Sequence, residues 1–124
     1  MLGAPVLEGR VFIVAGRGET FTGVARRLVA DGALVAVITT DEEVPDVAAR
    51  FRADHTDPDV WDRVVPHVEQ RLGPIDAVLT DQLGYPTAER LVGPDLLRRG
   101  HGAVVVVPPE ADADSVLRTL IGTP

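Results

Sequence analysis

The chain has 124 residues and a mass of 13.2 kDa, a size that predicts one domain spanning residues 1–124. Twelve basic and 19 acidic side chains give a net charge of −7, which argues against binding to nucleic acid or to an anionic membrane. All the basic residues are Arg, and the chain has neither Lys nor Cys. A phosphate-loop Lys, a Schiff-base Lys, a thiol nucleophile and a thiolate metal site are therefore excluded within these residues.

The first third of the chain alternates short apolar runs with a helical pattern. Residues 11–15 form a continuous apolar run, as a strand buried on both faces requires. Residues 21–29 carry apolar side chains at helical spacing, and Gly32 is suited to a left-handed cap at the end of that helix. A second buried strand is expected over residues 33–38.

The middle of the chain continues this alternation. We expect a short helix over residues 44–50 and a short strand over 51–53. Asp57 and Pro58 are a strong start for a long helix, which Pro66 should kink or split.

The last third predicts two more strands. Residues 75–79 form the fourth strand, and residues 80–87 are expected to be a loop. Residues 88–99 form either one helix or a helix broken near Gly93. The run 103–107 is the most apolar of all, so we expect this strand to be central or well covered, with a final helix after it. Strands and helices in this order predict a parallel sheet built from βαβ units.

A ligand crevice in such a sheet lies past the carboxyl ends of the strands, where the strand order reverses. The turn containing Gly16, Arg17 and Gly18 is the best phosphate-binding candidate, because glycines let the backbone approach a phosphate at a helix N-terminus. The dinucleotide fingerprint is incomplete, since its third Gly comes two residues late, at Gly23. Glu19 also brings negative charge, which Arg17 offsets in part. The alternative is a tight strand-to-helix turn in which Gly23 packs the helix.

Five segments in chain order resemble the first half of a short-chain dehydrogenase/reductase. They match the family's opening strand, the end of its first helix, its Asp-Val-Thr/Ser-Asp segment, the approach to its fourth strand and the approach to its fifth. The matching stretches are residues 9–16, 26–33, 54–57, 71–79 and 96–105. The resemblance implies NAD(P) as the cofactor, although no cofactor is certain from the sequence.

The departures from this family concern its catalytic residues. Only Gly16 fits cleanly in the family's Thr-Gly-x-x-x-Gly-x-Gly turn, and residues 81–84 replace its Asn-Asn-Ala-Gly motif. Pro108 or Pro109 stands where the catalytic Ser belongs, and no Lys follows Tyr85 at the family's spacing. In that family the Tyr is the acid, and the Lys lowers its pKa and holds the ribose. We therefore expect no hydride transfer of the family's type by this chain alone.

Several residues past the strand ends remain candidates for a site. Asp41 follows the Gly-rich turn at the spacing of a ribose ligand, or else belongs to a solvated acidic turn. Asp54 matches the family's Asp near the adenine, or else caps a loop. Histidine is a common general base, so His55 can act as one beside Asp81, and Tyr85 can line the mouth of the crevice. Surface, capping and loop roles are the alternatives for these three candidate catalytic residues.

Carboxylates at three strand ends raise the question of a metal. If Asp54, Asp81 and Glu110 converge, they can bind a hard cation or share a proton. We expect them to be solvated separately, and we predict no metal site.

Together these observations predict a three-layer, Rossmann-like, doubly wound α/β domain with about five parallel strands in the order 3-2-1-4-5. Three functions stay open. The first is a non-redox module that binds a small molecule, a nucleotide or a protein partner. The second is a small acid/base enzyme (an isomerase, cyclase or hydrolase) in the old cofactor crevice. The third is one subunit of a split NAD(P)-dependent oxidoreductase.

Location and assembly are also predicted from the sequence. The start lacks the pattern of a signal peptide, and no apolar run is long enough to span a membrane, so we expect a cytoplasmic protein. The shortened sheet should uncover apolar surface at one edge, so we expect a homodimer or a partner subunit.

Overall fold

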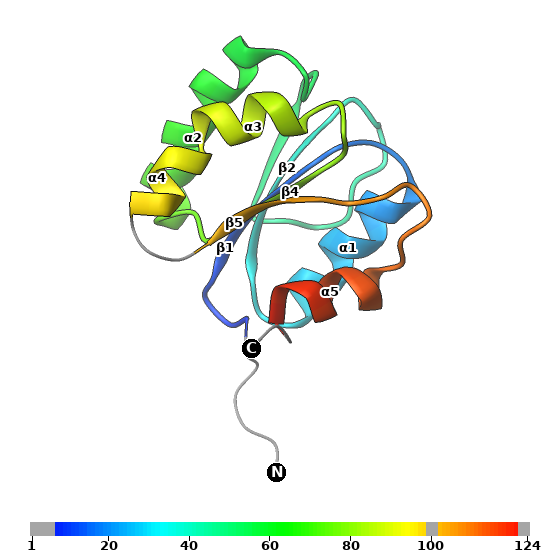
Figure 1. Cartoon of the computed structure of the whole chain (residues 1–124). Helices are drawn as coiled ribbons and strands as arrows, with labels where there is room; N and C mark the ends of the chain where they lie inside the picture. The colour runs from blue at the N-terminus through cyan, green and yellow to red at the C-terminus, as the bar shows by residue number, and fades with distance from the viewer. Residues whose placement is uncertain (1–6, 99–101, 122–124) are drawn as a thin grey trace.

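The computed structural model describes residues 7–98 and 102–121, with side chains up to residue 118. Strands and helices follow one another along the chain, with no helix between β2 and β3 and no strand between α3 and α4 (Figure 1). In chain order the elements are β1 (Val11–Ala15), α1 (Glu19–Ala30), β2 (Leu34–Thr39), β3 (Ala49–Arg52), α2 (Pro58–Leu72), β4 (Ala77–Thr80), α3 (Tyr85–Leu91), α4 (Gly93–Arg98), β5 (Ala103–Val106) and α5 (Ala113–Ile121).

All five strands are parallel and lie in one sheet, in the order β3-β2-β1-β4-β5. The predicted order 3-2-1-4-5 is therefore confirmed. From β1 the chain moves outward through β2 to β3, and α2 then carries it back to β4 on the other side of β1. The strand order reverses between β1 and β4, so a ligand crevice is expected at their carboxyl ends.

Helices cover both faces of the sheet, with α1 and α5 on one side and α2, α3 and α4 on the other (Figure 1). The central strand β1 shows why two layers are needed, since all five of its side chains are buried. Phe12 and Val14 belong to the core cluster that includes α1 and α5. Val11, Ile13 and Ala15 belong to the cluster that includes α2, α3 and α4. Successive strand residues point to opposite faces, so both halves of the continuous apolar run are used.

Helix α2 begins as its sequence predicts, with Asp57 as the N-cap and Pro58 at the first helical position. The Asp57 carboxylate accepts a hydrogen bond from the Asp59 amide at 2.9 Å. The sequence predicted that Pro66 would kink or split this helix, and the structure shows no split, since one helix continues to Leu72. The buried stripe of α2 extends on both sides of the proline, from Val60 to Val68, and holds the helix against the sheet.

Two of the predicted elements are wrong. No helix forms over residues 44–48, where Val44 and Val47 instead pack on the core from an irregular segment, and β3 already begins at Ala49. The expected loop is shorter, because α3 starts at Tyr85. The break near Gly93 is confirmed, since it separates α3 from α4.

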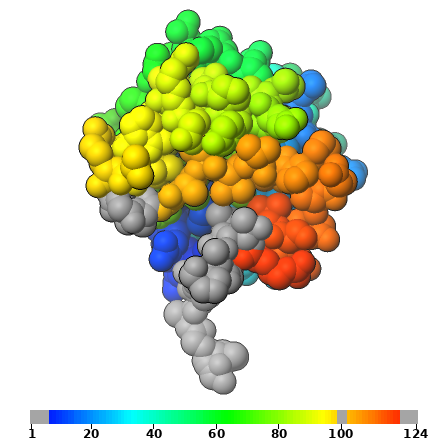
Figure 2. Space-filling view, in the orientation of Figure 1, coloured from blue at the N-terminus to red at the C-terminus, as the bar shows by residue number. Residues whose placement is uncertain are grey.

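The fifth strand is also placed differently from the expectation. It lies at the edge of the sheet rather than in its centre, and its four side chains are half-buried or exposed. In Figure 2 the orange segment that contains β5 reaches the surface below α3 and α4. In the part of the chain that the structure describes, no helix is both long and apolar enough to cross a membrane.

Candidate functional site

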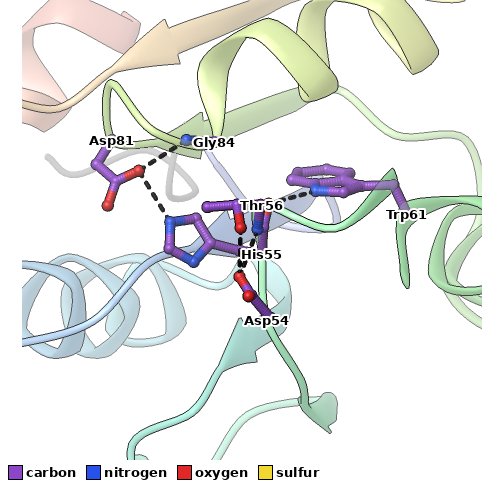
Figure 3. A network of polar contacts seen from close by, with 6 residues as sticks. All are labelled: Asp54, His55, Thr56, Trp61, Asp81 and Gly84. Carbon is purple, nitrogen blue, oxygen red and sulfur yellow. Dashed lines mark hydrogen bonds and ion pairs between the residues drawn. The ribbon is translucent and has the colours of Figure 1, made fainter. Parts of the chain in front are cut away.

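Two residues that are far apart in the sequence meet at the carboxyl edge of the sheet (Figure 3). His55 follows β3, and Asp81 directly follows β4. The His55 Nε2 atom lies 2.9 Å from Asp81 Oδ1, and the same oxygen accepts a hydrogen bond from the Gly84 amide at 2.9 Å. The structure thus brings together two of the three predicted catalytic candidates. One oxygen of the Asp81 carboxylate contacts both the His55 ring and the Gly84 amide.

The two partners differ in exposure. His55 is only 6% exposed, so it does not take the surface role that the sequence left open. Its backbone carbonyl accepts a hydrogen bond from Trp61 Nε1 at 2.7 Å, which ties this segment to the buried face of α2. The side chain of Asp81 is 27% exposed. Asp81 is therefore the member of the pair that solvent or a ligand can reach.

Thr80 and Gly84 complete the surroundings of this pair, and neither residue carries a signal for this role in the sequence. Gly84 has φ of −86°, which any residue adopts, so its small size matters rather than its flexibility. A Cβ atom at Gly84 would overlap Thr80 Oγ1 and would lie 2.7 Å from His55 Cδ2. Thr80 Oγ1 is buried and has no hydrogen-bond partner among the described residues. Close packing thus fixes the position of the His55 ring.

The glycine-rich turn is occupied by a carboxylate of its own chain. Gly18 has φ of 97°, a conformation that favours glycine, and it is the N-cap of α1. Its amide donates a hydrogen bond to Asp41 Oδ2 at 2.7 Å. Asp41, which was predicted to bind a ribose, therefore binds the turn that was predicted to bind a phosphate.

Two other glycines near this turn differ from the expectation. A Cβ atom at Gly16 would lie 2.8 Å from the ring of Phe21, so this glycine lets the ring close over the end of β1. Gly23 faces open space, because beyond its own helix backbone and chain neighbours no described atom lies within 4 Å of where a Cβ atom would stand. The expectation that Gly23 packs the helix is wrong, although the tight turn itself is present.

A crevice with a volume of about 410 Å³ lies between the β1–α1 turn and the segment after β5. Thr20 Oγ1 donates a hydrogen bond to the Pro109 carbonyl at 2.9 Å and joins the two sides. The lining residues are Arg17, Gly18, Glu19, Thr20, Phe21, Asp81, Val107 and Pro109. A volume of this size suits a small molecule.

The predicted site residues do not all reach this crevice. Arg17, Gly18 and Asp81 line it. Gly16 and Asp41 instead line a second cavity of about 10 Å³, which is too small for more than one water molecule. The remaining candidates, His55, Asp54 and Tyr85, line neither of these two cavities.

Asp54 and Tyr85 have local structural contacts. Asp54 Oδ1 accepts hydrogen bonds from the hydroxyl and the amide of Thr56, at 2.7 and 2.8 Å. These bonds hold the pKa of Asp54 below its ordinary value, and the bond from the Thr56 hydroxyl has the largest effect. The charges of His55 and Arg17 lower this pKa further. Tyr85 is half-buried at the start of α3, where its amide donates to the Asp81 carbonyl at 3.0 Å.

The carboxylates at the strand ends do not form a metal centre in the described part of the chain. No group of three or more His, Asp or Glu side chains among residues 7–98 and 102–121 is placed to hold a metal ion.

Comparison with solved structures identifies the fold. The ligand-free aldohexose dehydrogenase of Thermoplasma acidophilum matches 77% of this chain with a TM-score of 0.66 and 19% identity, over 48% of its own length. A short-chain dehydrogenase of Bacillus anthracis matches 77% of this chain with a TM-score of 0.63 and 14% identity, over 54% of its length. The fold is that of the short-chain dehydrogenases/reductases. No protein-family model and no curated protein matches the sequence.

The likeness to short-chain dehydrogenases/reductases has a defined extent. The chain spans about half the length of these two solved structures. The shared part is the parallel sheet with its helices, and the sequence identity is low. The match therefore establishes the short-chain dehydrogenase/reductase fold, while the activity of this chain has to be argued from its own site.

Proposed function

We propose that this chain is a non-redox binding module with a short-chain dehydrogenase/reductase fold, and that it takes a small molecule in the crevice beside Asp81. The observation that carries the proposal is the hydrogen bond from the Gly18 amide to Asp41 Oδ2 at 2.7 Å. A pyrophosphate bound at this turn needs the backbone amides as donors. Here the amide at the N-cap of α1 is already bound to a carboxylate.

The charges around the turn also oppose a dinucleotide. Glu19 and Asp81 line the crevice, and Asp41 stands on the other side of Gly18. Arg17 is the basic residue that lines the crevice, and it forms no ion pair with the described residues. An anionic pyrophosphate would therefore meet more negative than positive charge. The residues present do not fit NAD(P), and we assign no step to it.

Calorimetric titration with NAD⁺, NADH, NADP⁺ and NADPH at low salt tests this proposal. We expect no binding up to about 1 mM. The Asp41→Ala variant frees the Gly18 amide, and it should bind ADP more tightly than the wild type does. Asp46→Ala is the matched control, because it removes the same charge from an exposed residue of the same segment. Micromolar binding of a dinucleotide by the wild type would overturn the proposal and favour a subunit of a split oxidoreductase.

Binding in the crevice has its own test. Small polar fragments titrated into the ¹⁵N-labelled chain should shift the amide signals of residues 17–21 and of Asp81. Fragments that bind only elsewhere, or not at all, would show that the crevice is not the binding site.

A second candidate function, an acid/base enzyme, is favoured by the contact between His55 and Asp81. The buried ring would orient the carboxylate, and Asp81 would be the group that exchanges a proton with a substrate in the crevice. Asp81→Asn should then lower turnover at least about 100-fold. Tyr85→Phe is the comparison variant, because Tyr85 is not among the residues that line the crevice. Undiminished turnover after combined substitution of His55, Asp81 and Tyr85 would exclude this function.

The homodimer stays a prediction. The edge strand β5 and the exposed side chain of Leu97, 82% exposed, flank a groove of about 410 Å³ between α4 and β5. An edge strand with apolar neighbours is a surface that another chain can pair with. Sedimentation at micromolar concentration tests this, and a stable monomer would count against it.

A further inference from the structure

We propose that the crevice recognises a small organic ammonium ion, with the carboxylate of Asp81 as the anion that binds it. This inference rests on the proposed function, because it names the class of ligand for the same crevice. It depends on how Asp81 is held, on which of its oxygens is free, and on the other charges that line the crevice.

The carboxylate of Asp81 is oriented before any ligand arrives. Its Oδ1 atom is held by two hydrogen bonds, from His55 Nε2 and from the Gly84 amide, each 2.9 Å long. Both donors are themselves fixed, since His55 is 6% exposed and Gly84 packs directly against Thr80 and His55. A group held in this way loses little conformational freedom when a ligand binds.

The second oxygen of the same carboxylate is available. Asp81 Oδ2 forms no hydrogen bond with any described residue, and in Figure 3 it points away from both the His55 ring and the Gly84 amide. Asp81 is part of the lining of the 410 Å³ crevice. An N–H donor that enters the crevice can therefore bind Oδ2 without breaking either existing hydrogen bond. A charged donor forms the stronger bond with a carboxylate.

The rest of the lining favours a cation with a short apolar body. Glu19 adds a second negative charge, and Arg17 supplies a single positive one, so the side chains that line the crevice carry an excess of negative charge. This excess is larger than the partial positive charge of roughly half a unit at the N-terminus of α1. A carboxylate or phosphate ligand would have to overcome this excess. Pro109 provides an apolar wall, and the buried residues Phe21 and Val107 also belong to the lining. A primary ammonium group on a short alkyl chain matches both features.

Three probes of one size test the proposal on the full chain: butylammonium, 1-butanol and butyrate. Each has four carbon atoms, and they differ in the head group, which is cationic, neutral or anionic. We expect ¹H–¹⁵N spectra to show saturable binding of butylammonium in the millimolar range, with shifts at residues 17–21 and at Asp81. 1-Butanol should bind about tenfold more weakly, and butyrate should not saturate.

The Asp81→Asn variant isolates the charge. The Asn side-chain oxygen can still accept from His55 and Gly84, so the local structure is retained, while an N–H₂ group replaces the free oxygen. We expect butylammonium affinity to fall at least about tenfold and 1-butanol affinity to change little. Asp46→Asn is the matched control, because it makes the same charge change outside the crevice, and its affinities should equal those of the wild type.

Three results would overturn the proposal: butyrate binding better than butylammonium, equal loss of affinity in the Asp46→Asn control, or no saturable binding of any probe. None of these results bears on NAD(P), so the dinucleotide titration above decides the proposed function separately. Micromolar dinucleotide binding, in contrast, would remove the proposed function whatever the ammonium probes show.

Discussion

Gly84→Ala should destabilise the chain through a single methyl group. The added Cβ atom would overlap Thr80 Oγ1, lie 2.7 Å from His55 Cδ2 and lie 3.4 Å from the His55 carbonyl oxygen. Thr80 and His55 are 0% and 6% exposed, so neither side chain can move out toward solvent. The φ of −86° suits alanine, and the cost is therefore one of packing. Overpacking of this kind costs about 1–3 kcal/mol of unfolding free energy.

Urea unfolding measures this cost, and Gly23→Ala is its control. Gly23 lies inside α1 with open space around the added methyl, so the same substitution should stabilise the chain by about 0.5–1 kcal/mol. The ring signals of His55 should move in Gly84→Ala and remain in place in Gly23→Ala. Both variants make the same Gly→Ala change, so a difference between them reports the surroundings of each glycine.

The reasoning would be refuted by a specific result. Suppose that the unfolding free energy of Gly84→Ala lies within about 0.5 kcal/mol of the wild-type value and that the His55 ring signals are unchanged. The packing around Thr80 would then not be what fixes the ring. The argument that His55 holds Asp81 in a preset orientation would then lose its structural basis.

Three further predictions concern single polar side chains. Thr80→Val replaces a buried hydroxyl that has no described partner, and it should stabilise the chain by about 1 kcal/mol in urea unfolding; a loss would point to a bound water as partner. Thr56→Val should raise the pKa of Asp54 toward its ordinary value near 3.8, as followed by NMR titration. Because the folded-state pKa is lowered, Asp54 stabilises the chain above that value, and this contribution is lost as the pH falls through the folded-state pKa. A variant whose Asp54 titrates as in the wild type would contradict that cause. Asp57→Ala removes the N-cap bond to Asp59 and should cost about 1 kcal/mol, whereas an unchanged stability would mean that water replaces the cap.

The sheet was predictable because its strands leave a strong mark on the sequence. Residues 11–15 are apolar without interruption, and β1 is buried at every position, as a strand covered by helices on both faces must be. The start of α2 was predictable for a similar reason, since Asp57 and Pro58 each satisfy a separate demand of a helix N-terminus.

The errors in the predicted elements arise where the spacing of apolar residues is compatible with more than one structure. Val44 and Val47 lie three residues apart, which suits a helix, but an irregular segment brings the same side chains onto the core. An unbroken apolar run is also not enough to place a strand centrally. β5 has such a run, and it lies at the sheet edge with its side chains only partly covered.

The candidate site was predictable only to the level of the sheet edge on which its segments lie. Strand ends in a parallel sheet share one edge, so the topology places His55 and Asp81 on the same edge. Their contact did not follow from the topology, because β2 and β1 lie between β3 and β4. Which of the two is buried did not follow, because this depends on Trp61, which binds the His55 carbonyl, and on the absence of a side chain at Gly84. Neither residue type signals such a role in the sequence.

Asp41 shows how the same residue supports opposite functions. Its distance from the glycine-rich turn is that of a ribose ligand, while the sequence equally allows a solvated acidic turn there. In the structure its carboxylate lies on the Gly18 amide at 2.7 Å and takes the donor that a phosphate would need. Glu19 and Asp81 add negative charge on the crevice side, against Arg17 alone. The backbone therefore keeps a Rossmann-like arrangement, while negative charge exceeds positive charge among the side chains at this turn, and this balance is the basis of our proposal of a cationic ligand.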